Sequence, residues 1–172
     1  MRKISIFNPS YAARIQAFVS TEETRYYLNG FSIEKHPTAG AYIVATDGHR
    51  LGIFYDESAT IAEKAIIKLP KDFIKACKGR SGYTKKIYVD HESATAYLAA
   101  ASDPDSTLPE NLNTLPHCES VALKVLIDAT FPDWTRVLPP APTTDSSKYS
   151  NFNAKYLADF GSARESRSAL IG

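Results

Sequence analysis

RYYLNG at residues 25–30 and ATDGHRL at residues 45–51 are the most informative stretches of this sequence. A third stretch, FPDWTRVLP at residues 131–139, follows much later in the chain. The second stretch contains Asp-Gly, a dipeptide that favours a tight turn between antiparallel strands. Aromatic and β-branched residues on both sides of that turn are typical of strands. The first two stretches therefore belong to one antiparallel meander.

The meander is predicted to contain three strands. Residues 26–33 are rich in aromatic and β-branched side chains, and residues 36–40 form a turn that contains Pro and Gly. Residues 42–46 form the second strand, and residues 51–55 resume after the Asp-Gly turn.

A strand followed by a helix precedes the meander. Residues 4–7 read as a short strand, Asn8 is a good helix N-cap, and Pro9 is a good first helical residue. The apolar stripe of this helix falls at i, i+4 and i+7 and consists of Tyr11, Ile15 and Phe18.

The same order of elements recurs after residue 60. Residues 65–69 read as a strand, Pro70 opens a helix, and Gly79 is a candidate C-cap. Further strands are predicted at residues 87–89, 94–98 and 120–127, with a long, polar, Pro-containing loop at residues 102–117 that we expect to be mobile or functional. Two strand-helix-strands units indicate an internal pseudo-repeat and an α+β fold, with each helix covering one face of an antiparallel sheet.

The domain organisation follows from composition. Residues 1–139 are predicted to form one domain, and the Pro-, Thr- and Ser-rich residues 140–150 a linker. Residues 151–172 contain FNAKY, an echo of FNPSY near the N-terminus, and then an amphipathic helix that Gly161 could cap. We interpret this end as the start of an incomplete second module, because it lacks the strands needed to bury its apolar face.

Bulk composition excludes several classes of protein. The 172 residues carry 20 Lys and Arg against 19 Asp and Glu, so a strongly basic nucleic-acid binder is not indicated. Cys77 and Cys118 are too few for a disulfide framework and show no metal-ligand spacing. No apolar run is long enough to cross a membrane, and no signal peptide or phosphate-binding loop is visible. We expect a cytoplasmic protein without a metal or other cofactor.

Together, the three stretches resemble the middle domain of the bacterial DNA polymerase III beta subunit, the sliding clamp. The resemblance implies a DNA-clamp fold and a processivity factor that encircles duplex DNA and tethers replication proteins without catalysis. It also implies self-association into a ring. The match begins at Met1 with the middle domain, so the family's usual first domain is expected to be absent. Thr135 stands where a second basic residue is expected before Arg136.

Two functional surfaces are implied by the resemblance. The first is a hydrophobic groove that binds linear peptides of polymerases and clamp loaders, matched by Leu28, Thr46, Gly48, His49, Arg50, Leu51, Pro132, Arg136 and Val137. In the family, the following domain completes this groove. The second is a surface for sequence-independent contact with duplex DNA, matched or extended by Arg25, Tyr26, Tyr27, Lys71, Lys75 and Lys78.

Other interpretations remain open. A clamp-derived module could bind linear peptides or a replication protein without encircling DNA. A hydrolase using His49 and Asp47 is a third hypothesis, although no Ser or Cys nucleophile stands in a known motif. The lysines could be an ordinary solvated helix face, and Trp134 is expected to be a packing anchor.

Overall fold

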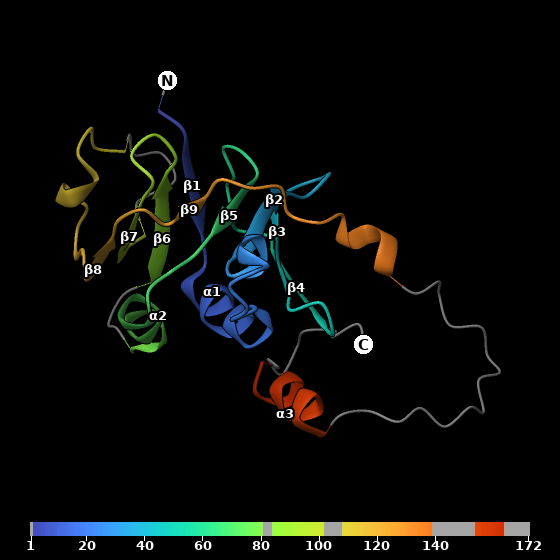
Figure 1. Cartoon of the computed structure of the whole chain (residues 1–172). Helices are drawn as coiled ribbons and strands as arrows, with labels where there is room; N and C mark the ends of the chain where they lie inside the picture. Colours follow the sequence, from blue (N-terminus) through green and yellow to red (C-terminus); the bar gives the residue numbers. More distant parts are fainter. Residues whose placement is uncertain (1, 81–83, 102–107, 139–153, 164–172) are drawn as a thin grey trace.

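The computed structural model describes residues 2–80, 84–101, 108–138 and 154–163, whose strands form two antiparallel sheets (Figure 1). The four-stranded sheet has the order β1 (Ile4–Phe7), β6 (Lys85–Asp90), β7 (Thr95–Ala100) and β8 (Ser120–Ala122). The five-stranded sheet has the order β4 (Leu51–Asp56), β3 (Ala41–Thr46), β2 (Phe31–Lys35), β5 (Ala65–Ile67) and β9 (Leu126–Ile127). The α-helices are α1 (Pro9–Ile15), α2 (Lys71–Lys78) and α3 (Ala154–Ala163), and the short 3-10 helices are η1 (Gln16–Phe18), η2 (Tyr26–Leu28), η3 (Leu112–Thr114) and η4 (Trp134–Val137).

The two halves of the pseudo-repeat exchange their first strands. β1 pairs with β6 of the second unit, and β5 pairs with β2 of the first unit. Each sheet therefore contains strands of both units. The predicted α+β arrangement and internal pseudo-repeat are present.

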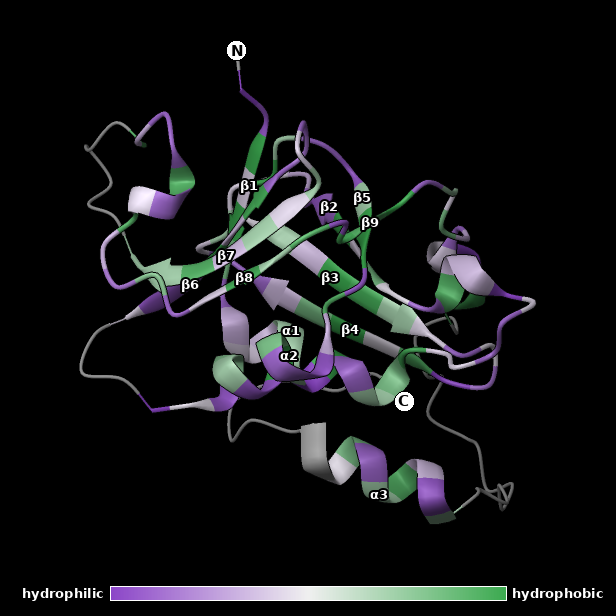
Figure 2. Cartoon of the chain, turned by 60° about the vertical axis from the view of Figure 1, so that its left-hand side comes forward, coloured by the Kyte–Doolittle hydropathy of each residue, from purple (hydrophilic) through white to green (hydrophobic). Residues whose placement is uncertain are grey.

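The helices α1 and α2 lie side by side on one face of the sheets, and α3 lies beyond them (Figure 2). α1 begins as predicted, because the Asn8 side chain accepts a hydrogen bond of 2.9 Å from the Ser10 amide and Pro9 is the first helical residue. Ile15 and Phe18 are fully buried between this helix layer and the sheets. Burial of this apolar layer is the main stabilising contribution to the fold.

A second apolar cluster covers the opposite face of the five-stranded sheet. Because side chains alternate along a strand, Ile43 points toward the helices and Val44 points away from them. We call the following buried residues on this opposite face the outer cluster: Leu28, Val44, Ile66, Phe131 and Trp134.

Two strand predictions were wrong in part. Residues 26–28 form the 3-10 helix η2, and the strand begins only at Phe31. The segment 120–127 is divided into β8 and β9, which belong to different sheets. Lys124, with a φ of 54°, turns the chain between them.

Other local predictions also need correction. The connection between β3 and β4 contains four residues, 47–50, rather than the Asp-Gly pair alone. Gly161 lies inside α3 and does not end it. Gly79 does follow α2, but in extended conformation. Of the loop 102–117, residues 102–107 lie outside the described residues, and Leu112 and Leu115 of the remainder are buried.

The predicted linker at residues 140–150 lies outside the described residues. Within the ranges that the structure describes, no helix is long and apolar enough to cross a membrane.

Candidate functional site

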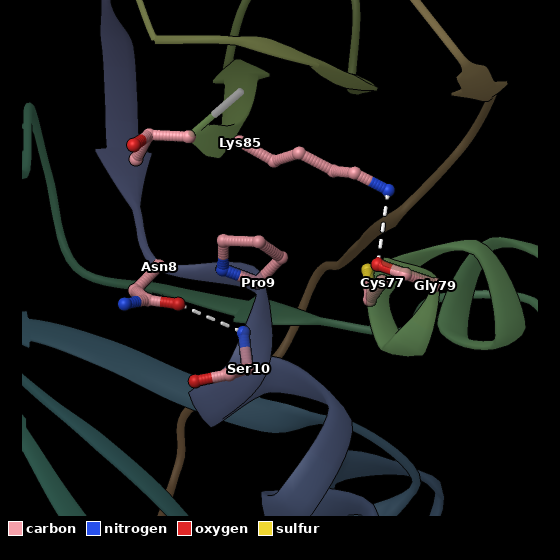
Figure 3. A pocket seen from close by; sticks show the side chains of 7 residues that line it. Asn8, Pro9, Ser10, Cys77, Gly79 and Lys85 are labelled. Carbon is pink, nitrogen blue, oxygen red and sulfur yellow. Dashed lines mark hydrogen bonds between the residues drawn. The ribbon is translucent and has the colours of Figure 1, made fainter. Parts of the chain in front are cut away.

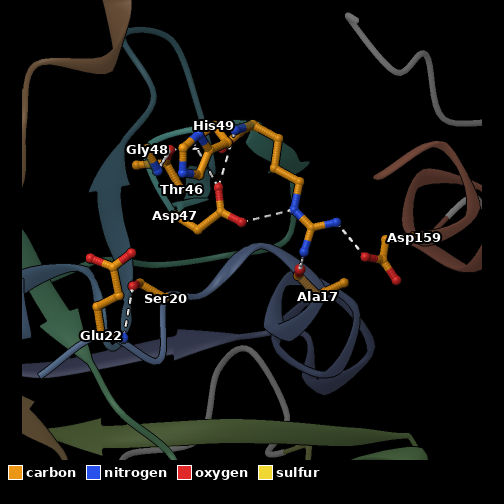
Figure 4. Close-up of polar contacts among 9 residues, drawn as sticks. Ala17, Ser20, Glu22, Thr46, Asp47, Gly48, His49 and Asp159 are labelled. Atoms are coloured by element: carbon orange, nitrogen blue, oxygen red, sulfur yellow. Dashed lines mark hydrogen bonds and ion pairs between the residues drawn. The ribbon is translucent and has the colours of Figure 1, made fainter. Parts of the chain in front are cut away.

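The loop 47–50 has a shape fixed by its own polar side chains (Figure 4). The Asp47 carboxylate accepts hydrogen bonds from the amides of His49 and Arg50, at 2.9 and 3.1 Å. The Thr46 hydroxyl accepts one from the Gly48 amide at 3.0 Å and donates to the Arg50 carbonyl at 2.7 Å. Gly48 has a φ of 89°, a conformation that favours glycine. The stretch ATDGHRL therefore encodes one specific loop conformation.

Arg25 lies directly over this loop. A Cβ atom at Gly48 would collide with the Arg25 guanidinium, so the glycine permits the close approach. The Glu22 carboxylate is 2.7 Å from the same guanidinium, and a hydrogen bond to Glu22 raises the pKa of Arg25. The stretches RYYLNG and ATDGHRL thus meet at the contact between Arg25 and Gly48.

Arg50 is turned toward the helix layer. Its Nε lies 3.1 Å from the Asp47 carboxylate, and it donates to the Ala17 carbonyl at 2.6 Å. It also pairs with Asp159 of α3. Its Cζ lies 5.6 Å from the Phe18 ring centroid and 4.6 Å from that of Tyr156, both within the range of a cation–π contact. Only 12% of the Arg50 side chain is exposed.

α3 supplies the partners of this loop that the sequence did not identify. The Tyr156 ring stacks on His49 with centroids 6.3 Å apart, and Phe160 packs edge-to-face on Phe18 at 5.0 Å. Tyr156 and Phe160 are four residues apart and therefore lie on one side of the helix. The FNAKY echo marks the helix, but no local pattern indicates what it contacts.

The outer cluster brings two predicted groove residues together. Leu28 is buried in it, and the half-buried Leu51 packs against it. Trp134 is 8% exposed and donates its indole N–H to Glu34, so its predicted role as a packing anchor agrees with its position.

Pro132, just before η4, and two residues of η4 place further predicted groove positions at the surface. Pro132 and Arg136 are exposed, and Val137 is 68% exposed. Arg136 forms an ion pair of 3.0 Å with Asp133, and both side chains remain largely in solvent. Trp134 anchors this short helix beside Leu28, so η4 borders the outer cluster on the side of the sheet away from α1.

The residues predicted to contact DNA do not form one patch. Lys71, Lys75 and Lys78 are exposed on α2, which packs on the helix-covered face of the sheets. Tyr27 packs against the outer cluster on the other face. Tyr26 is 55% exposed and touches Tyr27 edge-to-face.

A small cavity lies between the start of α1 and the end of α2 (Figure 3). It is lined by Asn8, Pro9, Ser10, Cys77, Gly79, Thr84 and Lys85. Lys85 extends across it and donates to the Gly79 carbonyl at 3.2 Å and to Glu119 at 2.6 Å, which satisfies the end of α2. Burial raises the pKa of the Cys77 thiol to about 12, so this thiol is a poor nucleophile.

The geometry gives no support to hydrolysis by His49 and Asp47. The Asp47 carboxylate is directed to the loop amides and to Arg50, and the imidazole stacks on Tyr156. In the described part of the chain, no group of three His, Cys, Asp or Glu side chains is placed to hold a metal ion.

The chain matches bacterial sliding clamps in sequence. It is 35% identical over 127 residues to the beta sliding clamp of Buchnera aphidicola, covering 64% of this chain and 34% of the clamp. It is 32% identical over 143 residues to that of Rickettsia bellii, covering 82% of this chain and 33% of the clamp. The chain thus spans about a third of the length of the curated relatives it matches. No protein-family model matches it.

Solved clamp structures have the same fold. A sliding clamp from Bartonella birtlesii bound to griselimycin superposes with a TM-score of 0.53 and 24% identity, over 80% of this chain and 35% of the clamp. A Pseudomonas aeruginosa clamp gives a TM-score of 0.53 and 19% identity, over 80% of this chain and 34% of the clamp. The resemblance and the clamp fold predicted from the sequence are confirmed, and this chain is a partial relative of the bacterial beta sliding clamps.

Proposed function

We propose that this chain is a clamp-like replication module: a processivity factor that acts without catalysis or cofactor and holds replication proteins at duplex DNA. The observation that carries the proposal is the two-faced arrangement of the fold. One face presents the outer cluster bordered by η4, and the other presents the lysines of α2. A cytoplasmic location follows from the same proposal.

The outer face is the proposed peptide-binding surface. Leu28 and Leu51 offer apolar area beside the exposed Val137, and Arg136 offers a polar contact at the rim. A hydrophobic side chain of a linear peptide would bury apolar area here, which is the main source of affinity in such contacts. The second wall of the groove would come from a following domain, of which we propose that residues 151–172 are the beginning.

The helix face is the proposed DNA-binding surface. Lys71, Lys75 and Lys78 recur at intervals of four and three residues, so they form a row along one side of α2. Such a row is suited to phosphates and carries no base specificity. Arg25 is paired with Glu22, Tyr27 is packed against the outer cluster and Tyr26 lies against Tyr27, so these three residues are not part of the row on α2.

Ring formation is proposed through the sheet edges. In the part of the chain described, β8 ends one sheet and β4 ends the other, and an edge strand has one row of backbone groups outside its sheet. Head-to-tail contacts between two different edges generate rings when the rotation closes. The alternative is a module that binds peptides without encircling DNA, and the nearly balanced net charge of +1 favours it.

Peptide binding tests the outer face. We expect Leu51→Ala and Arg136→Ala to weaken binding of a fluorescent Gln-Leu-x-Leu-Phe peptide, measured by anisotropy. Leu51→Ala removes part of an apolar side chain and should reduce affinity roughly 5- to 30-fold. Leu123→Ala is the matched control, because Leu123 is 73% exposed and lies outside the outer cluster. Griselimycin, which the Bartonella clamp binds, serves as a competitor. Unchanged affinity in both groove variants would exclude this surface.

Duplex affinity tests the helix face. We expect Lys71→Glu with Lys75→Glu to lower the affinity for duplex DNA at low salt and to flatten its salt dependence. Lys35→Glu with Lys124→Glu makes the same change of net charge at two exposed positions outside α2. Equal losses in both double variants would remove α2 from the DNA surface.

Solution mass separates the two candidate functions. Light scattering during size-exclusion chromatography should show a discrete multimer if the chain closes a ring through its sheet edges. A strict monomer over a wide concentration range would favour the non-encircling module.

A further inference from the structure

Arg50 joins three parts of the molecule that are distant in sequence. It pairs with Asp47 within its own loop, donates to the Ala17 carbonyl of η1, and pairs with Asp159 of α3. Since an arginine side chain loses considerable rotamer freedom when it is fixed, so many simultaneous contacts indicate a structural function.

α3 contacts the loop and η1 through one side of the helix. Tyr156 covers both His49 and the Arg50 guanidinium, and Phe160 packs on Phe18. Leu157 points elsewhere and is 53% exposed. The docked side of α3 is therefore specific: Tyr156 and Asp159 meet the Arg50 guanidinium, and Phe160 meets the Phe18 ring.

The loop that α3 contacts is also the connection between β3 and β4 at the proposed peptide surface. Leu51 follows Arg50 directly, and its side chain packs against the outer cluster. Because side chains alternate at this point, Arg50 faces the helix layer while Leu51 faces the opposite side. A displacement of Arg50 would therefore move the backbone that positions Leu51.

We propose that Arg50 is a positioning residue that couples the docking of α3 to the shape of the loop 47–50, and that this coupling acts on a bound peptide through the loop. The proposal rests on the proposed peptide surface only in its last step, the effect on affinity. Docking of α3 stabilises one loop conformation, and thermodynamic linkage requires that a ligand favouring that conformation also stabilises docked α3.

Hydrogen exchange measured by mass spectrometry tests the coupling without any peptide. Asp159→Asn removes the charge of one Arg50 partner while retaining the size of the side chain. We expect exchange of the amides in residues 154–163 to become roughly two- to fivefold faster, the range for a partly exposed ion pair. The coupling predicts that amides in residues 47–51 also exchange faster, although the substitution lies far from them in sequence. Leu157→Ala is the control on the same helix and should leave the loop unchanged.

A second variant tests the same contact in case the charge of Asp159 contributes little to the docking of α3. Tyr156→Leu removes the ring that covers both His49 and Arg50 and preserves an apolar helical residue. Faster exchange in α3 together with unchanged exchange in the loop, in both variants, would overturn the coupling. Unchanged exchange in α3 itself would show that the helix is not docked through these residues, and would overturn it as well.

Addition of the peptide provides a measurement that would not change if Arg50 had a purely structural role. With the Gln-Leu-x-Leu-Phe peptide bound, exchange in residues 154–163 should slow in the original chain and slow less in Asp159→Asn. If no peptide binds, the proposed function fails while the loop measurement still decides the coupling. If peptide binds and α3 does not respond, the coupling is refuted and the peptide surface is retained.

Discussion

Gly52→Ala should destabilise the fold through the contact between β4 and the helix layer. A Cβ atom at this position would lie 2.5 Å from Phe18 Cδ2, 2.7 Å from Phe18 Cγ and 3.0 Å from Ile15 Cδ1. Both neighbours are fully buried, so neither ring nor methyl group has free space to enter. Overpacking of this kind costs about 1–3 kcal/mol, and the reduced backbone entropy of the unfolded chain returns about 0.5–1 kcal/mol. Taken at the middle of these two ranges, the expected net loss is about 1–2 kcal/mol.

Urea unfolding followed by circular dichroism measures this loss. With an m-value of about 2 kcal/mol per molar, the midpoint should fall by roughly 0.5–1 M. Gly161→Ala is the matched control, because nothing lies within 4 Å of a Cβ atom there. That change should leave the midpoint equal or higher, since Ala is the better helix former. An unchanged midpoint in Gly52→Ala, with m also unchanged, would refute the close approach of β4 to Phe18.

Three further results are expected. Burial lowers the pKa of His91, whose Nε2 lies 2.7 Å from the Ser5 hydroxyl. The His91 imidazole therefore takes up a proton more readily in the unfolded chain than in the folded one. The free energy of unfolding should fall as the pH drops below about 6.5. His91→Gln should flatten that pH dependence, and an unaltered slope between pH 5 and 7 would contradict the assignment. Native-state alkylation followed by mass spectrometry should label the half-buried Cys118 before Cys77, the more deeply buried thiol; the reverse order would show that the cavity is open to the reagent. Trp134→Phe removes the hydrogen bond to Glu34 and should lower the free energy of unfolding by about 1 kcal/mol in urea titrations, and a neutral result would mean that the bond contributes nothing.

Local signals in the sequence were sufficient where one residue determines the local geometry. Asn8 and Pro9 begin α1 through an amide hydrogen bond and a fixed φ, both of which act within three residues. Gly48 likewise marks a turn because its φ is positive. These features need no tertiary context, and all three positions were assigned correctly.

Tertiary contacts decided the segments that were misassigned. Tyr26, Tyr27 and Leu28 have the composition of a strand, yet they form η2 because Leu28 is buried in the outer cluster and its carbonyl accepts from the Ser20 amide at 3.0 Å. The sequence also showed no sign of the exchange of β1 and β5 between the sheets. Their pairing partners lie at least 80 residues away for β1 and at least 32 for β5, and such distant pairs leave no periodic pattern. A pseudo-repeat predicts similar units but not which sheet receives each first strand.

Matching motifs placed Arg50 in the wall of a peptide groove, whereas its contacts place it between α3 and η1. A motif transfers the position of a side chain along the backbone but not the acceptors that surround it. A guanidinium bonds in whichever direction acceptors are available, and here these are Asp47, Asp159 and the Ala17 carbonyl. A peptide that recruited Arg50 directly would have to separate it from Asp159.

The two roles of Arg50 therefore predict opposite effects of one substitution. If a peptide competed with α3 for the guanidinium, Asp159→Asn would free Arg50 and tighten peptide binding. If Arg50 positions the loop, the same substitution loosens the surface that carries Leu51 and weakens binding. The sign of the change in affinity decides between them, because both effects act through the same ion pair and neither depends on the unknown size of that pair's contribution.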